Sequence, residues 1–265
     1  MVKICSKDFD IKKIAESGQI FRMNPCADGS YFLVAEDKTL RIFGNELCCS
    51  QSEFDSFWKG YFDLEADYEA FRNAVPKSDT FLRDASDFGR GIRILRQDPW
   101  EMLVSFIISQ RKSIPSIKVC IESLAAHYGE EIGEGVFAFP KAGALASASL
   151  EDLHSCALGY RDSYVLGAAR AVYEGKIDLE GLRGLCYEDL LGKLMELRGV
   201  GAKVANCVAL FAYHKIEAFP VDTWIEKVLR ERYAAGFPFE RYQGFAGVMQ
   251  QYMFYFARSG GAGSE

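Results

Sequence analysis

The sequence of 265 residues lacks any long hydrophobic run. No stretch approaches the roughly 18 uninterrupted apolar residues that a membrane-spanning helix needs. The first residues, Met1–Asp10, carry charged side chains and contain no apolar segment of the length found in secretory signal peptides. We therefore expect a cytoplasmic protein that has no signal peptide and does not bind a membrane.

The eight cysteines lack the spacing of a metal site. They form no C-x-x-C pair, and the adjacent Cys48 and Cys49 are poorly suited to bridging each other. Cysteines of cytoplasmic proteins are ordinarily reduced. We therefore expect free thiols rather than a disulfide framework.

The sequence also lacks an excess of positive charge, since 31 Lys and Arg residues stand against 37 Asp and Glu residues and give a net charge of −6. This balance argues against a protein that coats nucleic acid nonspecifically. Much of the acid lies in segment 53–69, in which six carboxylates accompany only Lys59. We expect this segment to face away from any bound nucleic acid.

With 49% hydrophobic residues, the chain can bury one large or two modest cores. Its first part alternates apolar and polar residues between turn signals, which predicts antiparallel strands, whereas the remainder has helical periodicity. The predicted strands cover 19–23, 31–35 and 39–43, with a loop over 24–30. The predicted helices cover 54–62, 67–75, 99–108, 114–128, 150–157, 162–174, 187–196, 202–214, 223–233 and 242–258.

This order, strands first and helices after, predicts an α+β fold. It divides the chain into an N-terminal antiparallel sheet domain with flanking helices (1–95), a mainly α-helical domain (96–258) and a flexible tail (259–265). The sequence contains no internal repeat, and its low-complexity residues are confined to that tail.

The most informative motif is a Gly-x-Gly turn, Gly199-Val200-Gly201, that leads directly into a predicted helix. Glycine adopts backbone conformations closed to other residues, so such a turn can point its amide groups outward at the mouth of the helix. These amides suit a phosphate group. A short glycine pattern is a weak signal alone, and its specificity comes from the residues that follow.

Two ionisable residues flank this turn. Lys203 lies in the first turn of the predicted helix, where the helix macrodipole and partial burial would lower its pKa and favour the nucleophilic neutral amine. Cys207, four residues on, would line the same pocket. Asp222 follows Pro220 and precedes another predicted helix, which it either caps or equips with a carboxylate for chemistry. The pair is more informative than either member.

These residues resemble the helix-hairpin-helix and Gly/Pro-Asp signature of DNA base-excision glycosylases. The lysine at position 203 resembles the bifunctional subfamily that includes 8-oxoguanine DNA glycosylase. Five separate segments similar to that family occur in the family's order along the chain. They are Ser17-Gly18-Gln19-Ile20-Phe21-Arg22, Tyr61-Phe62-Asp63-Leu64, Gln97-Asp98-Pro99-Trp100-Glu101, Leu158-Gly159-Tyr160-Arg161 and Gln250–Phe254.

The resemblance implies a DNA N-glycosylase with associated abasic-site lyase activity, which flips 8-oxoguanine out of duplex DNA and excises it through a lysine Schiff base. It implies a nucleoid-associated enzyme, which we expect to be a monomer. Lys203 would be the nucleophile at the sugar C1′, and Asp222 would stabilise the positive charge that develops as the base leaves. The lesion base would be bound by Gly18, Cys207, Pro220, Gln250 and Phe254. The DNA would be bound by Gln110, Arg111, Tyr160, Arg161, Gly199, Gly201 and Trp224.

Several of these implied roles are specific. The Gly18 carbonyl would accept the N7 hydrogen that distinguishes 8-oxoguanine from guanine, Cys207 and Phe254 would sandwich the base, and Gln250 would read its Watson–Crick edge. Tyr160 would wedge into the duplex while Arg161 reaches the orphaned partner base.

The resemblance also bears on cofactors. Backbone carbonyls of Leu197 and Val200 would hold a monovalent or adventitious cation at the hairpin. Some relatives in the superfamily carry four cysteines for an iron–sulfur cluster after the catalytic region, but no cysteine follows Cys207 here. We therefore expect no iron–sulfur cluster and no other cofactor.

Three positions depart from the family's pattern. Arg111 replaces an asparagine that contacts the opposite cytosine, Ser116 replaces an arginine, and Trp224 replaces a histidine. Two alternatives stay open: a glycosylase of the same fold for another damaged base, and a non-catalytic helix-hairpin-helix DNA-binding protein. The lesion-pocket residues argue against the first alternative. Retention of both Lys203 and Asp222 argues against the second, because binding alone needs neither.

Overall fold

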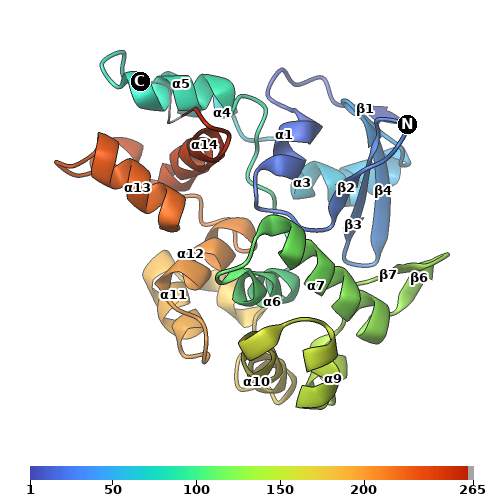
Figure 1. Cartoon of the computed structure of the whole chain (residues 1–265). Coiled ribbons are helices and arrows are strands. Elements are labelled where there is room, and N and C mark those ends of the chain that lie inside the picture. The colour runs from blue at the N-terminus through green and yellow to red at the C-terminus, as the bar shows by residue number, and fades with distance from the viewer. Residues whose placement is uncertain (262–265) are drawn as a thin grey trace.

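The computed structural model describes residues 1–261. A five-stranded antiparallel sheet lies on one side of the molecule, and a larger body of helices lies beside it (Figure 1). The strands follow the order β1-β5-β4-β3-β2 across the sheet. They are β1 (Val2–Lys3), β2 (Met23–Pro25), β3 (Tyr31–Ala35), β4 (Lys38–Phe43) and β5 (Glu46–Leu47). The predicted α+β fold is confirmed.

Strands β3 and β4 lie where the alternating pattern predicts them, and their register places Leu33 opposite Leu40 on the buried face. The strand predicted over 19–23 is wrong, because only Met23 joins β2. Side-chain hydrogen bonds tie Gln19 to the backbone of the linker before α6, so this stretch does not extend along a neighbouring strand. As a result, β2 includes the first residues of the predicted loop.

The helical part follows the predicted periodicity, with additional short elements. The helices are α1 (Ile11–Glu16), α2 (Gln51–Glu53), a π-helical segment (Phe54–Trp58), α3 (Lys59–Tyr61), α4 (Tyr68–Asn73), α5 (Thr80–Phe88), α6 (Pro99–Ser109), α7 (Ile114–Tyr128), α8 (Ala142–Ala146), α9 (Leu150–Ser155), α10 (Asp162–Tyr173), α11 (Tyr187–Met195), α12 (Ala202–Phe211), α13 (Thr223–Arg232) and α14 (Ala246–Arg258). A small hairpin and three 3-10 turns complete the fold: β6 (Glu131–Gly133), β7 (Val136–Phe137), Gly159–Arg161, Gly181–Gly184 and Phe239–Tyr242. Within residues 1–261 no helix is both long and apolar enough to cross a membrane.

Helices α1, α2, α5 and α8 were not predicted from the sequence. Two predicted helix ends also differ. Helix α12 ends at Phe211 rather than at residue 214, and His214 lies at φ +54°, outside the helical region. Helix α14 begins at Ala246 rather than at residue 242, because Gly244 at φ +84° interrupts the chain between a 3-10 turn and the helix.

Two hydrophobic cores hold the molecule, and they do not divide the chain at residue 95. The smaller core packs the sheet against α1 and Trp58. The larger core includes residues of α4 and α5 together with the later helices, and α5 packs directly on α14. The structured part of the predicted tail, residues 259–261, is hydrogen-bonded to the last turn of α14. The rest of that prediction, residues 262–265, lies outside the described residues.

The two cores are joined by a buried polar junction around Asp63. Its carboxylate contacts Arg96 Nη2 at 2.9 Å and His214 Nε2 at 3.1 Å, and it accepts a hydrogen bond from the Tyr68 hydroxyl. Burial raises the pKa of Asp63, but His214 and Arg96 outweigh burial and leave that pKa below its usual value. The junction fixes the end of α12 against the sheet domain.

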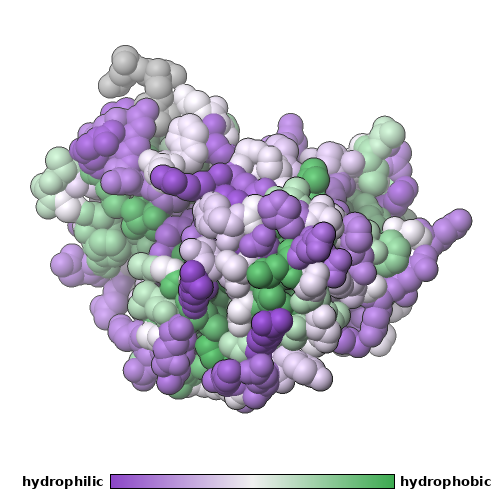
Figure 2. Space-filling view, turned by 60° about the horizontal axis from the view of Figure 1, so that its bottom comes forward, coloured by the Kyte–Doolittle hydropathy of each residue, from purple (hydrophilic) through white to green (hydrophobic). Residues whose placement is uncertain are grey.

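The surface is mixed in polarity. On the face shown in Figure 2, hydrophobic residues form separate patches among hydrophilic ones. Scattered apolar residues of this kind are ordinary on protein surfaces. No carboxylate of the acidic segment 53–69 lines the groove described next, although Asp63 is buried rather than solvated.

Candidate active site

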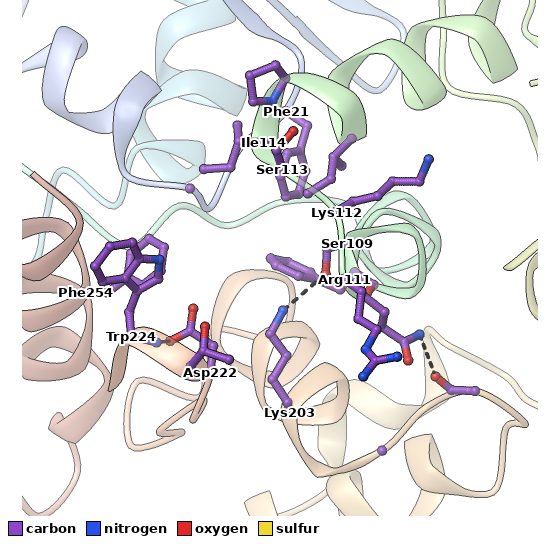
Figure 3. Close-up of a pocket in the computed structure, with 18 of the residues that line it drawn as sticks. Phe21, Ser109, Arg111, Lys112, Ser113, Ile114, Lys203, Asp222, Trp224 and Phe254 are labelled. Carbon is purple, nitrogen blue, oxygen red and sulfur yellow. Dashed lines mark hydrogen bonds between the residues drawn. The ribbon is translucent and has the colours of Figure 1, made fainter. Parts of the chain in front are cut away.

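A groove of about 1190 Å³ runs between the hairpin that precedes α12 and the loop that joins α6 to α7. Its remaining walls come from the loop at Gly18, the start of α13 and the end of α14. Figure 3 shows Lys203 and Asp222 projecting into this groove from two different elements, facing Ser109 and the α6–α7 loop. Segments far apart in the sequence therefore meet here.

Helices α11 and α12 and their hairpin form the predicted helix-hairpin-helix. Gly199 lies at φ +88°, and an added Cβ would approach the Tyr164 ring to 2.5 Å, so both conformation and space require glycine. Gly201 has extended backbone and no side-chain cap at the start of α12. We expected both glycines to be required for their conformational freedom, but only Gly199 has a conformation that needs it. Gly201 leaves the first amides of α12 uncovered, where an anion can approach.

Lys203 is half-buried in the first turn of α12. Its Nζ donates a hydrogen bond to the Ser109 hydroxyl at 3.1 Å and lies 5.2 Å from the centre of the Phe106 ring. Both partners belong to α6, so the amine is held over the groove rather than extended into solvent. Ser109 was not predicted as a site residue, because its contact with Lys203 joins positions 94 residues apart.

Asp222 caps α13 and also faces the groove. A single oxygen, Oδ1, accepts the backbone N–H groups of Trp224 at 3.1 Å and Ile225 at 2.9 Å. Among the described residues, Oδ2 has no hydrogen-bond partner. The two interpretations of Asp222 from the sequence are therefore compatible, because capping fixes the carboxylate and leaves one oxygen for chemistry.

The residues assigned to the lesion base surround a second, smaller cavity of about 50 Å³ beside Lys203. This cavity is lined by Gly18, Cys207, Pro220, Gln250 and Phe254, among others. It shares Gly18, Lys203, Asp222 and Phe254 with the lining of the groove, so the two spaces adjoin. Phe254 is one of the partly buried residues of its lining, together with Gly18, Lys203 and Asp222.

Two polar groups in this cavity have defined states. Burial raises the pKa of the Cys207 thiol, and the nearby Lys203 opposes that rise only in part. Cys207 is therefore a neutral thiol that does not compete with the lysine as a nucleophile. Gln250 donates from Nε2 to the Pro220 carbonyl at 3.0 Å, while its Oε1 is buried without a partner in the described chain. Pro220 thus orients the glutamine.

The residues assigned to DNA contacts fall into two groups. Tyr160, Trp224 and Arg111 are exposed along the groove, with side-chain exposures of 52% for Tyr160 and 40% for Trp224. Gln110 and Arg161 instead bond within the protein. The Arg161 guanidinium donates to the carbonyls of Gln110 and Leu158 and stacks on the Tyr160 ring, 4.3 Å from its centre.

Gln110 in turn links the α6–α7 loop to the hairpin. Its Nε2 donates to the Ile107 carbonyl and, at 3.0 Å, to the Gly199 carbonyl. Gln110 and Arg161 therefore hold three groove loops together, and the structure does not direct their donors toward DNA. This connection was missed in the sequence, because it depends on loops that are distant along the chain.

The hairpin carbonyls assigned to a cation are also in place. The Leu197 carbonyl accepts the Val200 N–H at 3.0 Å, as in a tight turn. Across residues 1–261 no group of three or more His, Cys, Asp or Glu side chains could hold a metal ion. A cation at Leu197 and Val200 stays a prediction.

A helix-hairpin-helix followed by a lysine and a capping aspartate on one groove defines the class of base-excision glycosylases. The family comparisons agree. Residues 1–103 match the family of the 8-oxoguanine DNA glycosylase N-terminal domain, and residues 104–236 match the HhH-GPD superfamily of base excision DNA repair proteins. The chain belongs to this superfamily, in the branch with the 8-oxoguanine DNA glycosylase N-terminal domain.

Individual relatives cover most of the chain. A probable N-glycosylase/DNA lyase of Methanothermobacter thermautotrophicus is 33% identical over 76% of this chain and 73% of its own length. The structure of MBOgg1 with a low-affinity DNA ligand has a TM-score of 0.90 at 37% identity, covering 97% of this chain and 94% of that chain. The 8-oxoguanine glycosylase/lyase of Clostridium acetobutylicum, in complex with double-stranded DNA containing cytosine opposite to 8-oxoguanine, has a TM-score of 0.89 at 35% identity, covering 96% and 93%.

Proposed function

We propose that this protein excises 8-oxoguanine from double-stranded DNA and then cleaves the abasic strand by β-elimination. One observation carries the proposal: Lys203 Nζ and the free Oδ2 of Asp222 face one groove beside the cavity that contains Gly18 and Cys207. A nucleophile, an anion and a base pocket are therefore adjacent. A DNA-binding module would need only the hairpin.

The chemistry follows from this arrangement. The Lys203 amine attacks C1′ of the extruded nucleotide with its nitrogen lone pair, and the bond from C1′ to the base breaks with its electron pair leaving on the base. One amine proton passes to the departing base and the other to the ring oxygen O4′, so that the sugar ring opens and leaves a Schiff base between Lys203 and C1′. Loss of a C2′ proton then expels the 3′ phosphate, which is the lyase step. Ser109 keeps the amine within the groove before attack.

Asp222 acts on charge rather than on protons. As the base leaves, positive charge develops on the sugar, and a fixed carboxylate in a water-poor site stabilises that charge. The carboxylate needs no rearrangement, because two backbone amides of α13 already hold it.

Selection between 8-oxoguanine and guanine depends on whether N7 of the base donates or accepts a hydrogen bond. 8-Oxoguanine carries a donor at N7 where guanine carries an acceptor, so the Gly18 carbonyl attracts the first and repels the second. A mismatch of this kind costs on the order of 1–3 kcal/mol. Cys207 and Phe254 would stack on either face of the base, and Gln250 Oε1, which has no protein partner, is available to its Watson–Crick edge.

The same proposal covers location and cofactors. A duplex-DNA substrate places the enzyme at the nucleoid in the cytoplasm, acting as a monomer. The eight cysteines of the sequence do not have the spacing of an iron–sulfur cluster, and we assign no cofactor beyond a monovalent or adventitious cation at the carbonyls of Leu197 and Val200.

The proposed function is tested with a panel of duplexes that differ in one base. We expect the wild-type protein to release 8-oxoguanine, to form a covalent adduct with that duplex in the presence of borohydride, and to leave undamaged guanine in place. Duplexes containing 3-methyladenine or uracil serve as controls for another damaged base. Release of a control base without release of 8-oxoguanine would assign the fold to a different lesion, and binding without release would make the protein a non-catalytic module.

We further expect the choice of partner base to be relaxed. Ser116 is too short to reach a base and instead lies 2.9 Å from the Ser113 hydroxyl, while Arg161 is engaged by backbone carbonyls. A good bidentate contact contributes about 1–3 kcal/mol of discrimination against the wrong base. Loss of one such contact should therefore reduce the preference for cytosine over the other partner bases by roughly 10-fold or more. Single-turnover rates on 8-oxoguanine opposite each of the four bases measure this.

Arg111 is the residue that could reverse that expectation. It is exposed at the groove and lies at φ +53°, which turns its side chain out of the helical path. A strong preference for cytosine that disappears in Arg111→Ala would show that Arg111 reads the partner base. In that case the idea of relaxed specificity would be wrong.

A further inference from the structure

The loop that carries Gly18 is held from the opposite end of the chain by helix α14. Gln251 is only 2% exposed, and its Nε2 donates to the Ser17 carbonyl at 2.6 Å. About two turns further along the helix, the Arg258 guanidinium donates to the Glu16 carbonyl. Two successive carbonyls before Gly18 are thus fixed by the helix that also supplies Gln250 and Phe254 to the base pocket.

The position of Gly18 leaves it little freedom. It lies at φ +79°, and an added Cβ would come within 2.9 Å of the Phe254 ring. The peptide group that joins Ser17 to Gly18 is planar, so the direction of the Ser17 carbonyl fixes one side of Gly18. A rotation of that peptide changes φ at Gly18, and unless ψ at Ser17 changes by an opposite amount it turns the Gly18 carbonyl as well.

Other contacts hold the fold of this loop independently of Gln251. The Ser17 hydroxyl donates to the Ile14 carbonyl at 2.7 Å, and Gln19 Nε2 donates to the Ser17 hydroxyl at 2.9 Å. The Gln19 amide is bonded in turn to the backbone at Arg93 and Leu95. These bonds fix the position of the loop that carries Gly18. The bond from Gln251 instead fixes the direction of the Ser17 carbonyl.

We propose that Gln251, assisted by Arg258, is a positioning residue for base discrimination, which aims the Gly18 carbonyl at N7 of the extruded base. The inference rests on the proposed function, because it concerns how the same pocket separates 8-oxoguanine from guanine. Hydrogen bonds weaken steeply with angle, so a carbonyl that is free to rotate loses both the attraction to N7–H and the repulsion of a bare N7.

The test is Gln251→Met, which keeps the volume and flexibility of the side chain and removes its N–H donor. We expect single-turnover excision of 8-oxoguanine to slow by about 10-fold, which corresponds to roughly one hydrogen bond. Cleavage of a duplex with a preformed abasic site should change by less than about 2-fold, because that substrate has no base for Gly18 to read. The ratio of 8-oxoguanine to guanine binding should fall in parallel.

Two further variants make the test specific. Tyr252→Phe removes the neighbouring buried polar group, which faces Arg72 rather than the Gly18 loop, and should leave both rates unchanged. Arg258→Gln removes the second bond from a partly exposed position and should reproduce the signature of Gln251→Met with a smaller effect. If Gln251→Met prevents folding, the rates of Arg258→Gln test the inference in its place.

The outcomes separate the inference from the function. Slow excision with normal abasic cleavage supports it. Equal loss of both rates, or no loss in Gln251→Met and Arg258→Gln, overturns it and leaves the proposed function standing. A wild-type protein that releases no 8-oxoguanine overturns the proposed function and the inference together.

Discussion

Lys203→Gln is expected to abolish base release and the borohydride-trapped adduct while DNA binding is largely retained. Glutamine has no nucleophilic amine, so neither attack at C1′ nor a Schiff base is available. Its amide can still donate to Ser109, which replaces the bond that the lysine makes at 3.1 Å. The groove should therefore keep its shape. Trapping on an 8-oxoguanine duplex and an equilibrium binding measurement on the same duplex check both halves of this prediction.

A matched control is available in the same motif. Lys193 lies on α11 and pairs with Glu196 at 2.9 Å, away from the groove. Lys193→Gln removes the same charge and should leave the adduct undiminished. An adduct of normal yield in Lys203→Gln would show that another amine is the nucleophile.

Asp222→Asn is expected to slow the single-turnover reaction by the order of 10²-fold or more with a much smaller change in affinity for DNA. Asparagine caps helices about as well as aspartate, so the bonds to the amides of Trp224 and Ile225 can persist. The substitution thus removes the charge and retains the cap. Single-turnover rates and a melting temperature, measured on one preparation, separate these two roles.

Asp67→Asn is the matched control for this substitution. Asp67 caps α4 by accepting the N–H of Ala70 at 3.0 Å and does not line the groove. Asp67→Asn removes the same charge as Asp222→Asn and should leave the single-turnover rate unchanged. If Asp222→Asn reacted at the normal rate but melted at a lower temperature, Asp222 would be a helix cap and nothing more.

The sequence by itself was sufficient for the features that local chemistry controls. The alternation in 31–43 predicted two paired strands, and the helical periods located α6, α7 and α10 to α13 closely. The Gly-x-Gly turn with Lys203 indicated a nucleophile at a helix start, since glycine conformation and helix position are properties of a few consecutive residues. The order of the elements then predicted the α+β architecture.

Local patterns were misleading where long-range hydrogen bonds override them. Residues 19–23 alternate like a strand, but Gln19 is bonded to a linker more than 70 residues away. The guanidinium of Arg161, which the resemblance assigns to the partner base, is bonded here to carbonyls of two groove loops, and its role toward DNA stays a prediction. A side chain's partner depends on which segments the fold brings near it, and that information is not contained in its neighbours.

The tertiary structure alone decided how the site is assembled. The amine of Lys203 meets Ser109 from α6, and the Gly18 loop is gripped by Gln251 from the last helix. Each contact joins residues about 90 or more positions apart. The first forms between two helices of the larger core, and the second joins a helix of the larger core to a loop that follows a helix of the smaller one. The sequence therefore determined which groups we propose for the chemistry. Packing determined the direction in which those groups point, because hydrogen-bond direction is set by the relative placement of whole elements.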